Sequence, residues 1–332
     1  PGGASPPAVT SDRIRIAELT GKQAVEMART GLTPDKILTA KAFENALRVL
    51  LAIGGSTNGI IHLTAIAGRM GFDIDLEAFD KMSRETPVLV DLKPSGQHYM
   101  EDLHRAGGLQ TVLHELRPLL HLDALTVTGR TLGEELDDIP VFSQEVVRSF
   151  SDPIYPAGGI AFLRGNLAPE GAIIKQSAAD QQLMEHEGRA VVFEDSEDMA
   201  LRIDDPDLDV NADDILVLKN IGPYGAPGMP EAGYLPIPKK LARQGVKDMV
   251  RISDGRMSGT AAGTIVLHVT PEAAKGGTLA LVQNGDRIRL SISNRSIELL
   301  VSEQEIEQRR QGWQPIKLVD AERGYRKLFY EQ

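Results

Sequence analysis

Two short segments of the sequence carry polar side chains among glycines and prolines. Residues 220–231 (NIGPYGAPGMPE) end at the carboxylate of Glu231, and residues 253–260 (SDGRMSGT) hold Ser258 beside a glycine. Each segment directly follows an apolar run that predicts a strand, and loops at strand ends commonly carry active-site residues. A turn explains either segment alone, and a solvated charge explains Glu231 alone. The pairing of two such loops after two successive strands, each with one chemically useful oxygen, points instead to a shared site.

Other polar segments have ordinary structural explanations. Residues 54–58 (GGSTN) place hydroxyls at the start of a predicted helix, where an anion would be favoured, but a helix cap explains them equally well. His62 is expected to pack within that helix, and the spacing of His98 and His104 does not match a zinc site. Residues 207–213 (DLDVNAD) resemble the start of a calcium loop, but the glycine and the glutamate that such a loop requires are missing. We interpret this segment as a solvated acidic turn.

The composition is typical of a globular chain with a sizeable core. The chain has 332 residues, of which 42% are hydrophobic, and its length predicts two domains. Its net charge of −11 opposes contact with nucleic acid, because such contacts rely on Lys and Arg neutralising phosphates. No apolar run approaches the roughly 18 residues of a membrane span, and residues 1–5 (PGGAS) lack the features of a secretory signal, so the expected location is the cytoplasm. The absence of cysteine excludes disulfides, thiolate catalysis and a cysteine-ligated cluster within these residues.

The apolar pattern changes at about residues 149–157. Up to residue 152, apolar positions recur at helical spacing, so this part is expected to be mainly helical. From residue 153 to residue 332, short apolar runs separated by Gly, Asn, Asp and Pro favour a β-barrel or a closed mixed sheet. The predicted helices are residues 76–84, 110–120, 197–202, 238–244 and 303–310, a stripe from Phe43 to Leu51, and a helix capped by Ser56. The predicted strands are residues 160–163, 172–174, 190–193, 215–218, 249–252, 264–269, 279–282, 287–292 and 297–301.

Six ordered blocks resemble those of the dihydroxy-acid dehydratase and phosphogluconate dehydratase family. They are residues 54–58 (GGSTN), 100–108 (MEDLHRAGG), 126–129 (TVTG), 163–169 (LRGNLAP), 227–231 (PGMPE) and 254–259 (DGRMSG). Six blocks in the family's order are highly specific. The resemblance implies an α/β fold class. Residues 1–152 would be the helical remainder of an α/β cluster-binding domain, and residues 153–332 a carboxy-terminal β-barrel-like domain similar to the swivelling domain of aconitase.

The resemblance also implies roles for residues of both loops. Ser258 matches the family's catalytic base, an alkoxide that takes the C2 proton of the substrate, and Glu231 matches a magnesium ligand. Thr260 matches a substrate contact, and Arg256 is expected to orient the loop or the substrate. Family members ligate a [2Fe–2S] cluster through cysteines of an amino-terminal half that is missing here, so this chain is expected to hold no cluster ligand. In the intact enzyme, Mg²⁺ would stabilise the enediolate-like charge and the cluster would act as a Lewis acid on the departing hydroxide.

Residues 218–223 (LKNIGP) and 259–268 (GTAAGTIVLH) resemble the sugar-acid branch of the family, which includes L-arabinonate and D-xylonate dehydratases. The expected reaction removes water from a small sugar acid to give a 2-keto-3-deoxy acid, in a homodimer or homotetramer without nucleic acid or membrane. The alternative substrate is the dihydroxy acid of branched-chain amino-acid biosynthesis. Without the missing half the chain is expected to be inactive, and a non-catalytic binding or assembly module is a second hypothesis. A metal-independent hydrolase would need a His near Ser258, and neither loop contains one.

Overall fold

The computed structural model describes residues 2–137, 139, 145–228, 230–259, 262–316 and 322–331. The chain divides into two compact units, Pro1–Ile160 and Ala161–Gln332. The sequence placed this boundary earlier, between residues 152 and 153. The chain up to residue 160 groups with the first unit because its backbone is hydrogen-bonded there: Val88 N donates to Tyr155 O at 2.9 Å, and Gly158 N donates to Ser83 O at 2.6 Å.

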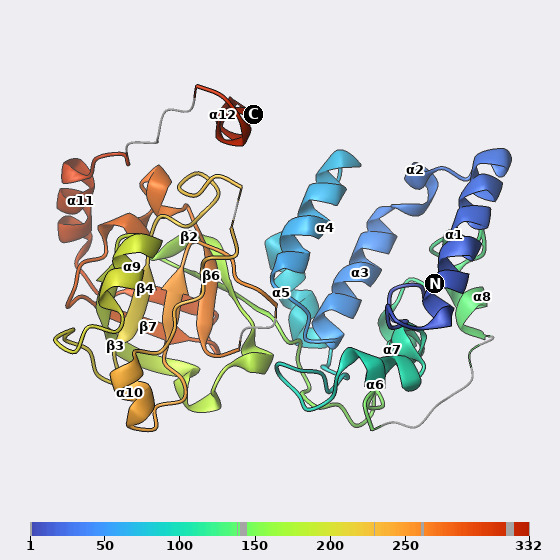
Figure 1. Cartoon of the computed structure of the whole chain (residues 1–332), viewed down its shortest axis with the longest axis horizontal. Helices are drawn as coiled ribbons and strands as arrows, with labels where there is room; N and C mark the ends of the chain where they lie inside the picture. Colours follow the sequence, from blue (N-terminus) through green and yellow to red (C-terminus); the bar gives the residue numbers. More distant parts are fainter. Residues whose placement is uncertain are drawn as a thin grey trace. The chain divides into compact units, whose positions relative to one another are not determined.

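The first unit is helical, as its apolar spacing predicts. Helix α3 shows how the sequence produces these elements, because the Thr39 side chain accepts a hydrogen bond from Ala42 N and the apolar stripe of Phe43, Leu47 and Leu51 is buried. In Figure 1 this helix lies beside α4 and α5, which it contacts. The helices of the unit are α1 (Ser11–Thr30), α2 (Pro34–Ile37), α3 (Ala40–Ala52), α4 (Asn58–Arg69), α5 (Leu76–Glu85), α6 (Met100–Arg105), α7 (Gly108–Glu115) and α8 (Leu132–Asp137).

Two helix predictions need correction. The helix expected over residues 110–120 is α7, which ends at Glu115 and is followed by a short 3₁₀ turn, Arg117–Leu119. Pro118 lies in that turn and cannot donate the hydrogen bond that an α-helix would need there. His62 does not pack within α4 as expected, because its side chain is exposed while Ile60 and Ala67 form the buried side of this helix.

The second unit is built on a closed barrel, which confirms the predicted barrel-like domain (Figure 1). The strands follow one another around it in the order β1-β2-β6-β5-β4-β3-β7-β8, and the bridge between Arg164 and Ser296 closes the ring. Strand β4 pairs in parallel with β3 and with β5, and β5 pairs in parallel with β6, whereas β3 pairs antiparallel with β7 and β6 pairs antiparallel with β2. The strands are β1 (Ala161–Gly165), β2 (Ala168–Ile174), β3 (Glu185–Phe193), β4 (Ile215–Leu218), β5 (Arg251–Ser253), β6 (Ile265–Thr270), β7 (Arg287–Ser291) and β8 (Ser296–Leu299).

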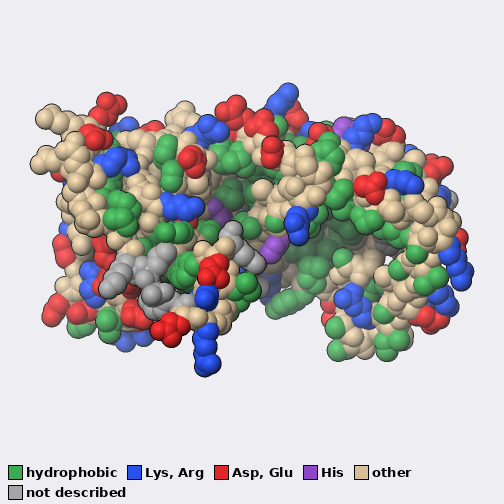
Figure 2. All heavy atoms as spheres, turned by 90° about the horizontal axis from the view of Figure 1, so that it is seen from above, with side chains coloured by type: hydrophobic (Ala, Val, Ile, Leu, Met, Phe, Trp, Pro, Cys, Tyr) green, Lys and Arg blue, Asp and Glu red, His purple; other side chains and the backbone are tan. Residues whose placement is uncertain are grey.

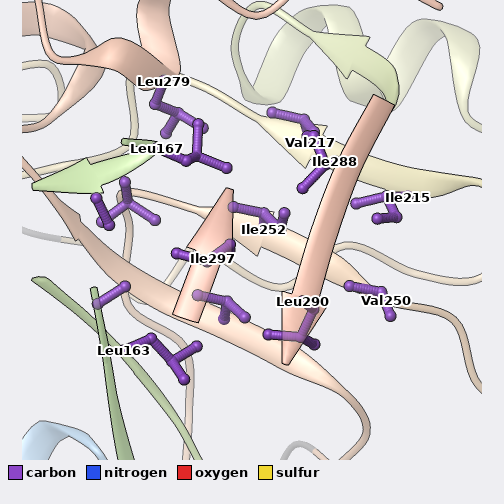
Figure 3. Packing of buried hydrophobic residues seen from close by; sticks show 14 of the residues in the cluster. Leu163, Leu167, Ile215, Val217, Val250, Ile252, Leu279, Ile288, Leu290 and Ile297 are labelled. Atoms are coloured by element: carbon purple, nitrogen blue, oxygen red, sulfur yellow. The ribbon is translucent and has the colours of Figure 1, made fainter. Parts of the chain in front are cut away.

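The barrel is filled by aliphatic side chains that come from all eight strands, and Figure 3 shows these side chains converging. Alternate residues of a strand point to opposite faces, so Ile215 and Val217 of β4 belong to this core while Leu216 and Leu218 pack in a separate cluster. Each such buried side chain stabilises the fold by about 1.5–3 kcal/mol relative to exposure. The residues labelled in Figure 3 are Leu163, Leu167, Ile215, Val217, Val250, Ile252, Leu279, Ile288, Leu290 and Ile297.

One strand prediction is wrong. Residues 279–282 do not form a strand, because Thr278–Leu281 is a 3₁₀ helix. Leu279 and Leu281 are buried all the same, and a short continuous apolar run does not distinguish a buried turn of helix from a buried strand. The helices of this unit are α9 (Ser196–Arg202), α10 (Lys239–Arg243), α11 (Glu303–Gly312) and α12 (Tyr325–Glu331).

The surface carries charges of both signs. On the face drawn in Figure 2, Lys and Arg side chains are interspersed with Asp and Glu. Among the residues that the structure describes, no helix has both the length and the apolar character needed to cross a membrane.

Candidate active site

The two loops singled out in the sequence leave the barrel at the same edge. They follow β4 and β5, which pair in parallel with Leu218 opposite Ser253. Parallel strands end at the same edge of a sheet, so residues 219–233 and residues 254–264 start side by side. The barrel therefore brings together two segments that are separated by a helix in the sequence.

Asp254 anchors the start of the second loop to the first. Its side chain is buried, and its carboxylate accepts hydrogen bonds from Ile221 N at 2.9 Å and from Ala273 N at 2.8 Å. Burial raises the pKa of this carboxyl to about 6, against the opposing effect of the backbone donors, and the nearby charge of Glu272 adds to the rise. One carboxylate thus ties three segments of the chain together.

Glu272 holds the first loop in a similar way. This buried side chain follows β6, and its carboxylate accepts hydrogen bonds from Tyr224 N at 2.9 Å and from Gly225 N at 3.2 Å. Gly222 lies so close that a Cβ there would overlap the carboxylate, so only glycine fits. Together with Asp254, this carboxylate fixes the backbone of residues 221–225.

A backbone hydrogen bond joins the two loops directly. Gly233 N donates to Arg256 O at 2.7 Å, and a Cβ on Gly233 would lie 2.8 Å from the same oxygen. Gly233 is two residues after Glu231, and Arg256 is two residues before Ser258. Glu231 and Ser258 therefore each lie two residues along the chain from one backbone contact between the loops.

The second loop is fastened at its far end as well. Asp248 accepts hydrogen bonds from Thr264 N at 2.8 Å and from the Thr264 hydroxyl at 2.7 Å, and it pairs with the buried Arg251 at 2.5 Å. Gly263 has a φ of +126°, and a Cβ there would overlap the Arg251 guanidinium. Between these fastenings Met257 packs into a cluster with Ile265 and Leu267. Ser258, the next residue along the loop, is half-buried.

Family models match this chain over both units. The model of the dihydroxy-acid/6-phosphogluconate dehydratase C-terminal domain matches residues 145–332, and that of the N-terminal domain matches residues 1–135. The chain belongs to the dihydroxy-acid/6-phosphogluconate dehydratase family. The loops with Ser258 and Glu231 lie within the C-terminal family domain.

Curated relatives in the dehydratase family cover nearly all of the chain. An L-arabinonate dehydratase of Rhizobium leguminosarum bv. trifolii is 50% identical over 316 residues, which are 95% of this chain and 55% of the relative. An L-arabonate dehydratase of Azospirillum brasilense is 51% identical over 93% of this chain and 54% of its own length. A dihydroxy-acid dehydratase of Methanothrix thermoacetophila is 46% identical over 95% of this chain and 58% of its own length. The chain thus spans little more than half the length of these dehydratases.

The structure places the predicted site residues of this dehydratase-family chain as follows. Ser258 and Arg256 are half-buried on the second loop, and Glu231 is exposed at the end of the first. Thr260 lies outside the described residues. The three described residues therefore stand on two loops that contact each other, whereas their roles in the dehydratase reaction stay predictions.

Sequence reasoning missed Asp254 and Glu272 as organising residues. Asp254 stands in the DGRMSG block that was recognised, and its position before a glycine was the available signal. Nothing in the local sequence marks Glu272, because its partners Tyr224 and Gly225 lie almost fifty residues away along the chain. Only the fold brings them together.

His268 lies behind the second loop. Its backbone N–H donates to Gly255 O at 3.2 Å, and burial together with the charge of Arg256 lowers the pKa of its imidazole to about 4. The imidazole is therefore neutral at pH 7. Its Nε2 is buried and makes no hydrogen bond to the described residues, so this nitrogen does not form the serine–histidine pair that a metal-independent hydrolase would need.

Glu231 offers one carboxylate, a hard oxygen ligand, for a cation. Among the described residues, no group of three or more His, Cys, Asp and Glu side chains could hold a metal ion. Magnesium is commonly held by one or two carboxylates together with water and substrate, so an exposed Glu231 fits as one ligand of a shared Mg²⁺ site. The chain has no cysteine and so does not fit cysteine ligation of an iron–sulfur cluster.

The acidic segment near residue 209 behaves as a turn in the structure. Asp209 and Asp214 both pair with Arg189, at 2.6 and 2.8 Å, and Asn211 Oδ1 accepts a hydrogen bond from Asp213 N at 3.0 Å. These side chains serve local structure. The predicted cap at Ser56 needs correction: α4 begins at Asn58 with Thr57 as its N-cap and no side-chain cap hydrogen bond from that residue, while the Ser56 hydroxyl, one residue earlier, accepts a hydrogen bond from Asn58 N at 3.2 Å.

Proposed function

We propose that this chain is the carboxy-terminal part of a hydro-lyase that removes water from a sugar acid to give a 2-keto-3-deoxy acid. The observation that carries the proposal is the contact between the two loops, Gly233 N to Arg256 O, which sets Glu231 and Ser258 on either side of one point. Two relatives named for arabinonate or arabonate support the sugar-acid class. The proposal concerns a longer protein, because the relatives are nearly twice as long as the matched region.

Ser258 is proposed to take the proton from C2 of the substrate. The C–H bonding pair remains on C2 as an enediolate-like charge, the C2–C3 double bond then forms, and the C3–O bond breaks with its electron pair on oxygen. The proton that Ser258 took then passes to the departing hydroxide, which gives water and restores the alkoxide, and the enol product tautomerises to the keto acid. Ser258 is half-buried in a loop that is fastened at both ends, so its hydroxyl loses little conformational freedom when the substrate binds.

A serine hydroxyl is a weak base unless positive charge lies close to it. Each unit by which its pKa falls requires about 1.4 kcal/mol of differential stabilisation of the alkoxide. A bound Mg²⁺ would supply such charge to the substrate oxygens and the serine. Glu231 would be one of its ligands, and Arg256 is proposed to orient the loop or substrate, with Thr260 as a further substrate contact. No step is assigned to an iron–sulfur cluster, since this chain offers no cysteine to hold one.

The second candidate substrate is a branched 2,3-dihydroxy acid. The relative from Methanothrix thermoacetophila, named as a dihydroxy-acid dehydratase, favours this possibility at slightly lower identity. Both substrates share the carboxylate, the C2 proton and the C3 hydroxyl, so the residues discussed above serve either. Discrimination must lie in contacts to the rest of the carbon chain.

A substrate panel on the full-length protein, prepared without oxygen, tests the proposal. We expect turnover of pentonates or hexonates in preference to branched dihydroxy acids, measured as keto acid formed. Preference for a branched acid would reverse the assignment of the substrate class, and no turnover of any acid would refute the function.

Substitution of Ser258 tests the proposed base. Ser258→Ala should lower kcat by several orders of magnitude because alanine has no oxygen to accept the C2 proton, while the metal content stays unchanged. Ser302→Ala, at the start of α11, is a matched control that loses a hydroxyl outside the loops. Near-normal turnover by Ser258→Ala would remove the assignment of the base.

A further inference from the structure

A buried lysine lies next to the loop that carries Ser258. Lys175 directly follows β2, and its side chain is only 6% exposed. Strand β2 pairs with β6, with Ile174 opposite Val266, so the next residue along β2 lies beside the start of β6. That start is also the end of the Ser258 loop.

Hydrogen bonds fasten the segment after Lys175 to the end of the same loop. Gly263 N donates to Ala178 O at 3.0 Å, and Asp180 N donates to the Thr264 hydroxyl at 3.0 Å. Lys175 itself accepts a hydrogen bond on its carbonyl from Ala178 N. The backbone of Lys175 is therefore held in place relative to residues 263–264.

Strand β6 connects the position of Lys175 with that of Met257. Ala172 and Ile174 of β2 pack in the barrel core with Val266. Residues of the opposite face include Ile265 and Leu267 of β6, which pack with Met257. Lys175 follows Ile174, which pairs with Val266, so the backbone of Lys175 lies next to Ile265, a residue that packs against Met257 of the Ser258 loop.

The charge of Lys175 has no partner among the described residues. The other buried cations are paired: Lys219 contacts Glu194 at 2.9 Å, and Arg251 contacts Asp248 at 2.5 Å. Burial lowers the pKa of the Lys175 ammonium to about 8, and no carboxylate opposes that effect. A buried cation without a counterion is costly, and a fold retains one most readily where an anion binds.

We propose that Lys175 is a substrate-binding residue of this site and that its ammonium binds the carboxylate of the acid beside Ser258. This inference rests on the proposed function. It adds a positive charge from the barrel itself to the charge that a bound metal would supply. The chemical class of ligand is a 2-hydroxy carboxylate, and an uncharged polyol should not bind to this residue.

Chemical protection of the lysine in the full-length enzyme tests this inference without any substitution. The enzyme is reductively methylated in three samples: with Mg²⁺ alone, with a pentonate that the enzyme turns over, and with the matching pentitol. Mass spectrometry then measures the modification of the peptide that contains Lys175. We expect the pentonate to slow modification of Lys175 at least several-fold and the pentitol to leave it unchanged. The exposed Lys247 should react at the same rate in all three samples.

Two variants give an independent measurement. Lys175→Met keeps the length of the side chain and removes its charge, and should lower kcat/KM for the pentonate about 10- to 100-fold, mainly through a higher KM. Lys175→Arg should restore part of the loss, and Lys247→Met is the matched control. A role in packing alone would predict no recovery with arginine and a lower Tm for Lys175→Met.

The outcomes separate the two proposals. If the enzyme turns over a sugar acid but the acid does not protect Lys175, or protects it no better than the pentitol, the lysine inference is refuted and the function stands. Unchanged kcat/KM in Lys175→Met refutes it in the same way. Absence of turnover with every acid overturns both. If Lys175→Met does not fold, the protection experiment still decides.

Discussion

Replacement of Asp254 by asparagine should change how the stability of the barrel unit depends on pH. The carboxyl of Asp254 is 3% exposed and burial raises its pKa to about 6, from an ordinary value of 3.8. A shift of this size corresponds to about 3 kcal/mol between the two protonation states, at roughly 1.4 kcal/mol per unit. The buried charge is thus an energetic cost at neutral pH, which the backbone donors only partly offset.

The sign of the effect follows from the direction of the shift. Because the folded pKa lies above the unfolded one, protonation of Asp254 stabilises the folded state, fully so below pH 3.8. That stabilisation is lost as the pH rises through about 6. Between these values the free energy of unfolding should fall by about 1.4 kcal/mol per pH unit from this group alone. Asparagine does not titrate, so the variant should lack this slope.

The variant also carries a cost that does not depend on pH. Asparagine has one acceptor oxygen where the carboxylate has two, so either Ile221 N or Ala273 N loses its partner. An unpaired buried donor costs about 1–3 kcal/mol. The difference in unfolding free energy between wild type and variant should therefore be largest near pH 4 and smallest above pH 7.

Urea unfolding at a series of pH values measures this difference. Trp313 is the one tryptophan of the chain and lies against Gly276 in the barrel unit, so its fluorescence reports on the unfolding of that unit. Asp207→Asn, at an exposed position, controls for the loss of one negative charge. A difference between wild type and Asp254→Asn that stays constant from pH 4 to pH 7 would refute the reasoning.

Two further substitutions test the fastening of the loops, with Gly245→Ala as a shared control because Gly245 has a φ of +94° and open space around it. Gly263→Ala should destabilise the barrel unit by over about 2 kcal/mol, measured by urea unfolding, because its Cβ would overlap the buried Arg251 guanidinium. The control Gly245→Ala should lose only about 1–2 kcal/mol, from backbone strain alone. Gly233→Ala should push the loops apart, because its Cβ would lie 2.8 Å from the backbone oxygen of Arg256. It should lower kcat of the full-length enzyme at least tenfold relative to the control, measured at a temperature at which both variants are folded. Equal activity of this variant and the control would contradict the proposed contact.

Much of the fold could be predicted from local pattern. The apolar stripe with Phe43 and Leu51 forms a helix, and the continuous apolar run Ile215–Leu218 forms a strand, as their spacing indicates. Each pattern has a preferred secondary structure in which its side chains are buried. The run at residues 279–282 did not, because four consecutive apolar residues satisfy burial equally well as a turn of helix. A closed barrel also followed from the number and spacing of the strands.

The two candidate loops were likewise visible in the sequence, because a cluster of glycine and proline with one polar residue after an apolar run can be recognised without knowing its partners. What the sequence could not show is which distant groups hold them. Glu272 accepts a hydrogen bond from Tyr224 N, and Asp248 accepts one from Thr264 N. These contacts, and the position of Lys175 beside the end of the Ser258 loop, exist only because β2, β6, β5 and β4 follow one another around the barrel. Strand order is decided by the burial of the whole core, and no local pattern encodes it. The sequence determined which residues could react, and the closed sheet decided which of them stand together.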